Sequence, residues 1–406
     1  MIDANPPSNS GSLESAPEAK IPLRDWLLLP LLGVLTICVV AVSSELIARQ
    51  MFTLSRTGVG RCLAFNDMSA GVRGIPNCVC WEKKYESPPV EYRFNSSGFR
   101  ADEDLVPKQP GTYRIVMIGS SVAMGKEVTR EKTFAALLPA KLSRRTGQRI
   151  ELYNEAIEGW GGTPHNIALR FNEVLDAQPD LILWILGPTD MTKLPPPDLH
   201  PETHLSRLER ALRFIKGALD RERGANTIGE AFDYTRTAIL LRHFLYQSQS
   251  LYVNSFTVQG DKDSWILAAG PSQAQQRLLQ DFDGVAAEIE AKARAARVPF
   301  VAVFVPNHGA LAAMISNDEW PVGYNPYKLD GELRSIVASH GGTYIDILPD
   351  FRNIPNPERG YFPVDGHPNP EGHAIIADLL AKELTGGAVP SLRAAAQNQV
   401  AEEQGK

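Results

Sequence analysis

From residue 114 onward, short apolar segments alternate with helical stretches, and this alternation limits the possible fold more than any other feature of the chain. Predicted strands cover residues 114–119, 150–154, 181–186, 299–305 and 343–347. Predicted helices cover residues 131–145, 165–177, 273–296 and 370–384. Strands separated by helices form parallel sheets that are covered on both faces. The sequence therefore predicts an α/β domain with three layers, α/β/α, around a central parallel sheet of about five strands.

A long insertion, residues 192–272, separates the third and fourth predicted strands. It contains helical patterns at residues 205–219 and 232–252. Because it follows a strand end, it is a candidate lid or substrate platform. The alternative is a helical elaboration that only covers the sheet.

An uncharged apolar run, residues 26–42, lies near the N-terminus. With the two serines that follow, it is long enough to cross a bilayer core of about 30 Å as a helix. A cleaved signal peptide is an alternative, because Ala41-Val42-Ser43 resembles a cleavage site, but the leader is not basic. A buried core helix is a weaker alternative, since nothing amphipathic marks the run. We predict a single-pass transmembrane anchor over residues 21–48.

The remaining regions divide by composition. Residues 1–20 are rich in Pro, Ser, Asn and Glu and are predicted to be disordered. Residues 49–110 form a lead-in segment between the anchor and the α/β domain, which covers residues 111–386, and residues 387–406 are a polar tail. The net charge of -6 argues against a nucleic-acid partner, since phosphate binding needs a basic surface.

The cysteines bear on the side of the membrane that the domain occupies. Cys38 lies in the predicted span, whereas Cys62, Cys78 and Cys80 follow it. A disulfide from Cys62 to either of the other two would require an oxidising compartment. Two free thiols in the C-x-C pair are an alternative, and zinc is a weaker one because no histidine lies nearby.

The charges that flank the span do not set its orientation. Two basic residues precede it and three follow it, so the positive-inside rule does not favour an external C-terminal domain. We nevertheless predict an extracytoplasmic domain, from the cysteines and from the family resemblance described below.

Four predicted strand ends carry polar or glycine-rich sequence, and ligands bind at this edge of parallel sheets. After the first strand, residues 119–125 read GSSVAMG. A serine on such a turn can expose its hydroxyl beside backbone N–H groups. Ser121 lies on this turn, and helix capping is the structural alternative for a serine here. After the second strand, residues 154–161 read NEAIEGWG, in which Gly159 could be a glycine needed only for a turn with positive φ.

The third and fourth strand ends add the remaining candidates. Residues 187–190 read GPTD, in which Thr189 can donate a hydrogen bond and Asp190 is interpreted as a structural partner. Residues 365–373 read DGHPNPEGH, and the Asn-Pro pair predicts a helix start. His367 would then lie in the loop before that helix, with Asp365 placed to orient its imidazole. His373, inside the helix, is interpreted as structural.

The four blocks, in this order, resemble those of the SGNH (GDSL-like) hydrolase superfamily, and residues 94–100 resemble the segment that leads into the first block in many bacterial envelope members. The resemblance implies a flavodoxin-like fold and a catalytic triad of Ser121, His367 and Asp365. It also implies an oxyanion hole from the N–H groups of Ser121 and Gly159 with Thr189. Three departures stand out: Ser120 replaces the usual aspartate, Thr189 replaces the usual asparagine, and the last block is Asp-x-His rather than Asp-x-x-His.

The predicted function is therefore a membrane-anchored serine esterase that acts on O-acyl groups, with the O-acetyl groups of a cell-envelope glycan as the implied substrate. Neither a cofactor nor a metal is expected, and the sequence identifies no protein partner. One alternative is an O-acetyltransferase with the same triad. The other is an inactive glycan-binding or scaffold protein, which the changes at Ser120 and Thr189 motivate.

Overall fold

The computed structural model describes residues 23–51, 58–65, 71–191, 235–258, 268–270 and 272–393. The chain divides into two units, residues 1–50 and 51–406.

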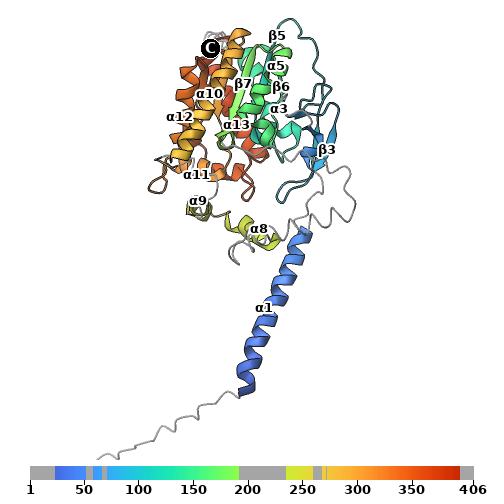
Figure 1. Cartoon of the computed structure of the whole chain (residues 1–406), viewed down its shortest axis with the longest axis vertical. Helices are drawn as coiled ribbons and strands as arrows, with labels where there is room; N and C mark the ends of the chain where they lie inside the picture. Colours follow the sequence, from blue (N-terminus) through green and yellow to red (C-terminus); the bar gives the residue numbers. More distant parts are fainter. Residues whose placement is uncertain are drawn as a thin grey trace, which may run out of the picture. The chain divides into compact units, whose positions relative to one another are not determined.

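A five-stranded parallel sheet forms the centre of the second unit (Figure 1). Its strands are β5 (Thr112–Gly119), β6 (Arg149–Asn154), β7 (Leu181–Leu186), β8 (Phe300–Phe304) and β9 (Thr343–Ile345). The spatial order is β6-β5-β7-β8-β9, and every neighbouring pair is parallel. All residues of β7 and β8 are buried, which explains why their sequences are continuously apolar. The prediction of a parallel sheet of about five strands is confirmed.

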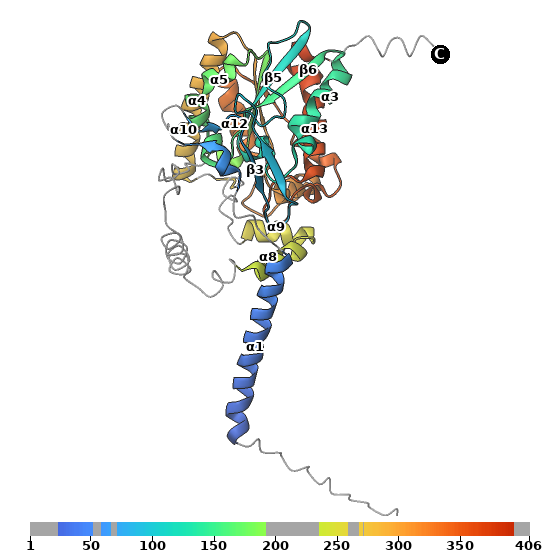
Figure 2. The same cartoon turned by 90° about the vertical axis from the view of Figure 1, so that its right-hand side faces the viewer.

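Helices cover the two faces of this sheet (Figure 2). On one face, α3 (Phe134–Thr146) packs against α13 (Pro370–Glu383). On the other lie α4 (Pro164–Leu169), α5 (Phe171–Asp176), α10 (Gln273–Ala295) and α12 (Lys328–Ser339). The sheet and its two helical layers give the predicted three-layer arrangement.

The strand order changes direction beside β5. The chain moves from β5 outward to β6 on one side, then returns to add β7 on the other side of β5. In doubly wound sheets, ligands bind at the carboxyl ends of the strands beside such a switch point. Gly119 at the end of β5 pairs with Ile185 near the end of β7, so the loops that follow these strands leave the same edge.

Two predicted helices differ from the structure in informative ways. The predicted helix at 165–177 is two short helices, broken at Arg170, whose guanidinium forms a buried ion pair with Glu155 at 2.6 Å. The first predicted helix starts at Phe134 rather than residue 131, because residues Arg130–Lys132 form a 3₁₀ turn and Thr133 caps the α-helix. The helices α11 (Gly309–Asn317) and α12 were not predicted.

The segment before the α/β domain folds as two small antiparallel hairpins within the second unit. β1 (Leu63–Ala64) pairs with β2 (Arg73–Gly74), and β3 (Val79–Glu82) pairs with β4 (Val90–Arg93). Apolar side chains of this segment, including Tyr92, are part of the same hydrophobic core as the central sheet. The described part of the predicted lead-in segment (residues 49–110), which is residues 58–65 and 71–110, packs against the domain that follows it.

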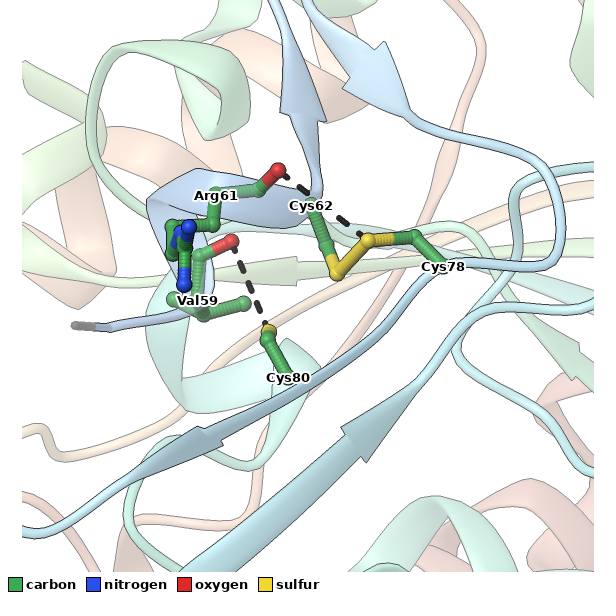
Figure 3. Close-up of a disulfide and its surroundings, with 5 residues drawn as sticks. All are labelled: Val59, Arg61, Cys62, Cys78 and Cys80. Carbon is green, nitrogen blue, oxygen red and sulfur yellow. Dashed lines mark hydrogen bonds between the residues drawn. A yellow bond between two sulfur atoms is a disulfide. The ribbon is translucent and has the colours of Figure 1, made fainter.

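A disulfide between Cys62 and Cys78 connects the 3₁₀ helix η1 (Val59–Cys62) to the chain just before β3 (Figure 3). The Cα atoms of the two cysteines are 5.5 Å apart, within the usual range for a disulfide. Cys80 is a buried free thiol whose sulfur lies 4.0 Å from the Val59 carbonyl oxygen. Of the two pairings that the sequence left open, the structure forms Cys62–Cys78.

The N-terminal unit is the helix α1 (Leu23–Met51), of 29 residues. Its segment Trp26–Met51 has a mean hydropathy of 2.5 and is long and apolar enough to cross a membrane. The helix continues three residues beyond the predicted end of the anchor at residue 48. By length and composition, both a membrane span and a signal sequence fit this helix.

The described part of the insertion consists of α8 (Arg236–Leu245) and α9 (Gln249–Val258). The predicted helical pattern at 232–252 therefore contains a break, at residues 246–248. The other predicted helix, residues 205–219, lies outside the described residues.

Candidate active site

Ser121 lies in the first turn after the central strand. β5 ends at Gly119, and Ser121 begins the one-turn helix α2 (Ser121–Met124), with Ser120 in an extended conformation before it. The side chain is half-buried at the carboxyl edge of the sheet. The predicted nucleophile thus occupies the edge where ligands bind in this architecture.

The structure brings the three predicted triad residues together. The Nε2 atom of His367 lies 2.8 Å from the Oγ atom of Ser121, although 246 positions separate the two residues in the sequence. The other ring nitrogen of His367, Nδ1, is hydrogen bonded to Oδ1 of Asp365. This arrangement allows the imidazole to accept the serine proton while the carboxylate fixes the ring orientation.

The short Asp-x-His spacing works because of the glycine between the two residues. Gly366 has φ +90°, in the left-handed region, and a Cβ atom there would lie 2.8 Å from Cδ2 of His308. The loop is closed by backbone hydrogen bonds from Gly366 to Phe362 and from Phe362 to His367, at 2.8 and 2.9 Å. A side chain at position 366 would therefore strain the backbone and collide with its neighbour.

The helix after this loop starts as the sequence predicts. Asn369 caps α13 by accepting hydrogen bonds from the N–H groups of Glu371 and Gly372, at 2.9 and 3.1 Å, and Pro370 occupies the first helical turn. The cap fixes the residues directly after His367.

Two backbone N–H groups are available for an oxyanion. Among the described residues, no acceptor receives a hydrogen bond from the N–H of Ser121 or of Gly159. Gly159 begins the 3₁₀ helix η3 (Gly159–Gly162), which lies directly against the serine turn. A Cβ atom at Gly162 would approach Cα of Ser120 to 2.5 Å, so this close approach requires glycine. The role of the two N–H groups as oxyanion donors stays a prediction.

Thr189 lies in the 3₁₀ helix η4 (Pro188–Met191), but its side chain lies outside the described part of the structure. Its role as an oxyanion donor stays a prediction. The neighbouring Asp190 is buried and accepts a hydrogen bond from the Gly187 N–H at 2.5 Å. Burial raises the pKa of the Asp190 carboxyl to about 8. These contacts agree with the structural interpretation of Asp190.

Side chains from three other segments brace the serine turn. The amide of Asn154 donates to the Ala123 carbonyl at 2.9 Å, and Lys126 forms an ion pair with Glu158 at 2.9 Å. The buried guanidinium of Arg100 donates to three carbonyl groups of the turn. These belong to Met124, Gly125 and Val128, at 2.5, 2.7 and 2.7 Å. Arg100 ends the 94–100 segment that the sequence analysis singled out, and this contact gives that segment a physical role.

Glu86 of the lead-in segment holds the loop that carries Asp365. Its side chain is 1% exposed, and Oε2 accepts hydrogen bonds from the N–H groups of Val364 and Asp365, both at 2.9 Å. Its other oxygen lies 2.7 Å from Nδ1 of His243 on α8. Sequence reasoning missed Glu86, because no motif marks a single glutamate that lies 279 positions before its partner.

We expect Glu86→Ala to lower both stability and activity. The substitution leaves the N–H groups of Val364 and Asp365 without an acceptor, at a cost of about 1–3 kcal/mol each, and frees the Asp365 loop. The melting temperature should fall by several degrees, and kcat for an acetyl ester should fall by about tenfold. The matched control is Glu91→Ala, which removes a more exposed glutamate of the same segment. Equal values for both variants would contradict the role of Glu86.

Two further histidines, the buried His373 and the half-buried His308, have structural contacts. His308 caps α11 by accepting from the Ala310 N–H at 3.2 Å, and its ring stacks on Tyr252 and Phe256 of α9 at 5.0 and 4.2 Å. Burial lowers the pKa of His308 to about 3. His373 accepts from the Phe134 N–H at 3.1 Å, and burial likewise lowers its pKa to about 3. The prediction that His373 is structural agrees with this contact.

The Asp365 carboxyl is kept ionised by its surroundings. Burial alone would raise its pKa, but the charge and hydrogen bond of His367 outweigh this effect. A hydrogen bond with Glu127 and the charge of Lys126 act in the same direction, so the pKa of Asp365 lies well below its usual range. An ionised carboxylate can stabilise the imidazolium that forms during proton transfer.

A metal site is not evident in the described part of the chain, where no group of three or more His, Cys, Asp or Glu side chains could hold an ion.

No family model and no curated protein matches the chain. Solved structures give distant matches. LAE5, an alpha/beta hydrolase enzyme from the metagenome of Lake Arreo, Spain, is 16% identical over 70% of this chain and 97% of its own, with a TM-score of 0.37. TesA is 13% identical over 67% of this chain and 98% of its own, with a TM-score of 0.37. Axe2, an acetylxylan esterase from Geobacillus stearothermophilus, is 12% identical over 67% and 94%, with a TM-score of 0.36. At these values, function must be read from the geometry of the site itself.

Proposed function

We propose that this chain is a membrane-anchored serine esterase of the SGNH type that removes O-acyl groups. The observation that supports it most directly is the hydrogen-bonded series from Ser121 Oγ to His367 Nε2 and from His367 Nδ1 to Asp365. Acyl transfer also requires stabilisation of negative charge on oxygen, and we assign this role to the N–H groups of Ser121 and Gly159, for which no acceptor is present among the described residues.

In the proposed mechanism, Ser121 Oγ attacks the ester carbonyl carbon while His367 Nε2 accepts its proton. The carbonyl oxygen becomes an oxyanion and is held by the N–H groups of Ser121 and Gly159, with the Thr189 hydroxyl as a third donor. Collapse of this intermediate breaks the ester bond, and the leaving alkoxide takes the proton from His367. Water, deprotonated by His367, then attacks the acyl-serine. The bond from the acyl carbon to Ser121 Oγ breaks, and His367 returns the proton to Oγ as the carboxylic acid is released.

The substrate class that we propose is the O-acetyl groups of a cell-envelope glycan, which follows from the family resemblance and from an extracytoplasmic location. The Cys62–Cys78 disulfide supports that location, because such bonds persist in oxidising compartments. We propose α1 as the anchor. Protease added outside the intact membrane should then digest the domain after α1, and protection of that domain would contradict the orientation.

A fluorophosphonate probe tests the proposed mechanism, because it labels a serine only when a base and an oxyanion site activate that serine. We expect the full-length wild-type protein to be labelled and the modified peptide to contain Ser121. Heat-denatured protein, as the control, should not react. Absence of labelling in folded wild-type protein would favour an inactive scaffold over an esterase.

A further inference from the structure

Glu127, six residues after the candidate nucleophile, is a buried glutamate that the mechanism does not yet use. It is 1% exposed and adopts φ +64°, a left-handed conformation that is uncommon for residues other than glycine. Its N–H donates to the Tyr92 hydroxyl at 2.9 Å. The backbone is thus held in a strained conformation that directs this side chain into the protein.

The carboxyl group of Glu127 meets another carboxyl group rather than a donor. No N–H or O–H of the described residues donates to either of its oxygens, both of which are buried. Instead it lies within hydrogen-bonding reach of the Asp365 carboxyl. Two neighbouring ionised carboxylates repel each other, so a hydrogen bond between them requires that one of them holds a proton.

The surroundings decide which of the two carboxyl groups is protonated. Asp365 accepts hydrogen bonds from the ring and the backbone N–H of His367, both of which favour its ionised form. Burial, and then the charge of Asp365, raise the pKa of Glu127 to about 9.

The lysines around Glu127 do not reverse this assignment. Lys126 and Lys84 favour the ionised form, but their effect is smaller than that of burial. Lys126 forms an ion pair with Glu158 at 2.9 Å, and Lys84 lies 3.7 Å from Glu82. Lys83 donates to the carbonyl groups of Lys84 and Ser87.

We propose that Glu127 is a positioning residue of the site, whose protonated carboxyl donates a hydrogen bond to the Asp365 carboxylate and keeps that carboxylate aimed at His367. The proposal rests on the proposed function, since it extends the triad by one member. No proton is transferred in this role: Asp365 stays ionised, and Glu127 keeps its proton through the catalytic cycle. The glutamate would fix the second oxygen of Asp365 while His367 holds the first.

Measurements of stability test whether Glu127 is protonated in the folded protein, and they do not depend on enzyme activity. Glu127 holds its proton in the folded protein but ionises above pH 4.5 in the unfolded chain, so folding must take up a proton at neutral pH. The free energy of unfolding of the wild-type protein therefore falls as pH rises above 4.5, and this fall levels off above about pH 9. Glu127→Gln is always neutral, so in detergent-solubilised full-length protein it should melt on the order of 5 °C higher at pH 8. The difference in melting temperature between Glu127→Gln and wild type should become smaller toward pH 5.

Kinetics test the positioning role. In wild-type protein, ionisation of Glu127 removes its hydrogen bond and repels Asp365, so kcat/KM for an acetyl ester should fall with a midpoint near pH 9. Glu127→Gln, which keeps a donor, should hold its plateau through that range and stay within about threefold of wild type at pH 7.5. Glu127→Met, of similar size but with no donor, should lose about tenfold in kcat with KM unchanged. Glu131→Gln, which changes an exposed carboxylate four positions away, should behave as wild type.

The outcomes separate the two proposals. A difference in melting temperature that does not vary with pH, or the same alkaline fall in wild type and Glu127→Gln, would overturn the role of Glu127 while leaving the esterase intact. If wild-type protein hydrolyses no ester, the proposed function fails and the positioning role fails with it. The pH dependence of stability would then still decide whether Glu127 holds a proton in the folded protein.

Discussion

Ser121→Ala should reduce kcat for an acetyl ester by about 10⁴-fold or more, because the substitution removes the atom that forms the acyl-enzyme. The Ser121 hydroxyl makes one hydrogen bond within the described residues, to His367, and that ring is 20% exposed, so water can replace the lost partner. The melting temperature should therefore change little. KM should also remain close to the wild-type value, since the backbone N–H groups of the site are kept.

The measurement is the initial rate of acetate release by purified full-length protein in detergent, with Ser335→Ala as the matched control. Ser335 is an exposed serine on α12, and its hydroxyl donates to the Gly331 carbonyl of the same helix. The control should retain the wild-type rate. If Ser121→Ala retains the wild-type rate as well, another group performs the chemistry and the proposed mechanism is wrong.

The sheet could be predicted from sequence because each strand and each helix has a hydrophobic pattern within its own residues. Segments such as 181–186 are apolar throughout, since both of their faces are buried, and the helices between them show their own periodicity. The same locality revealed the candidate site. In a parallel sheet every strand ends at the same edge, so polar turns that follow separate strands come together. This rule placed Ser121 at that edge. Its pairing with His367, 246 positions later, followed from the family resemblance, because residues 346–364 separate the end of β9 from Asp365.

The supporting residues could not be predicted, because their partners lie far away in the sequence and no periodic pattern marks them. Glu86 binds backbone N–H groups 278 and 279 positions later, and Arg100 binds carbonyl groups 24 to 28 positions later. The hairpins of the segment that contains these residues have strands of two to four residues, too short for an alternating pattern to be recognised. Glu86 and Arg100 support the site only when the lead-in segment packs against the folded α/β domain.

The lead-in segment and the insertion support the same loop. Glu86 holds the backbone of Asp365 and contacts His243 of α8, while Tyr252 and Phe256 of α9 stack on the His308 ring that backs Gly366. The sequence analysis offered two interpretations of the insertion, a lid or a covering element. These contacts give its described part a third role. α8 and α9 fix the loop that presents Asp365 and His367.

Asp365→Asn should lower kcat by about 10³- to 10⁴-fold while the protein stays folded. An asparagine amide can present an N–H group to Nδ1 of His367, which favours the tautomer that cannot accept the serine proton at Nε2. It also removes the charge that stabilises the imidazolium. The loop itself should persist, because Glu86 binds the backbone N–H at this position rather than the side chain. Asp378→Asn on α13 is the matched control, since that carboxylate is 64% exposed and pairs with Lys141. The measurement is kcat at pH 7.5 together with the melting temperature of each variant. If Asp365→Asn keeps more than about a tenth of the wild-type kcat, the ring of His367 is oriented by other contacts, and the Asp-x-His loop serves only to deliver the imidazole to Ser121.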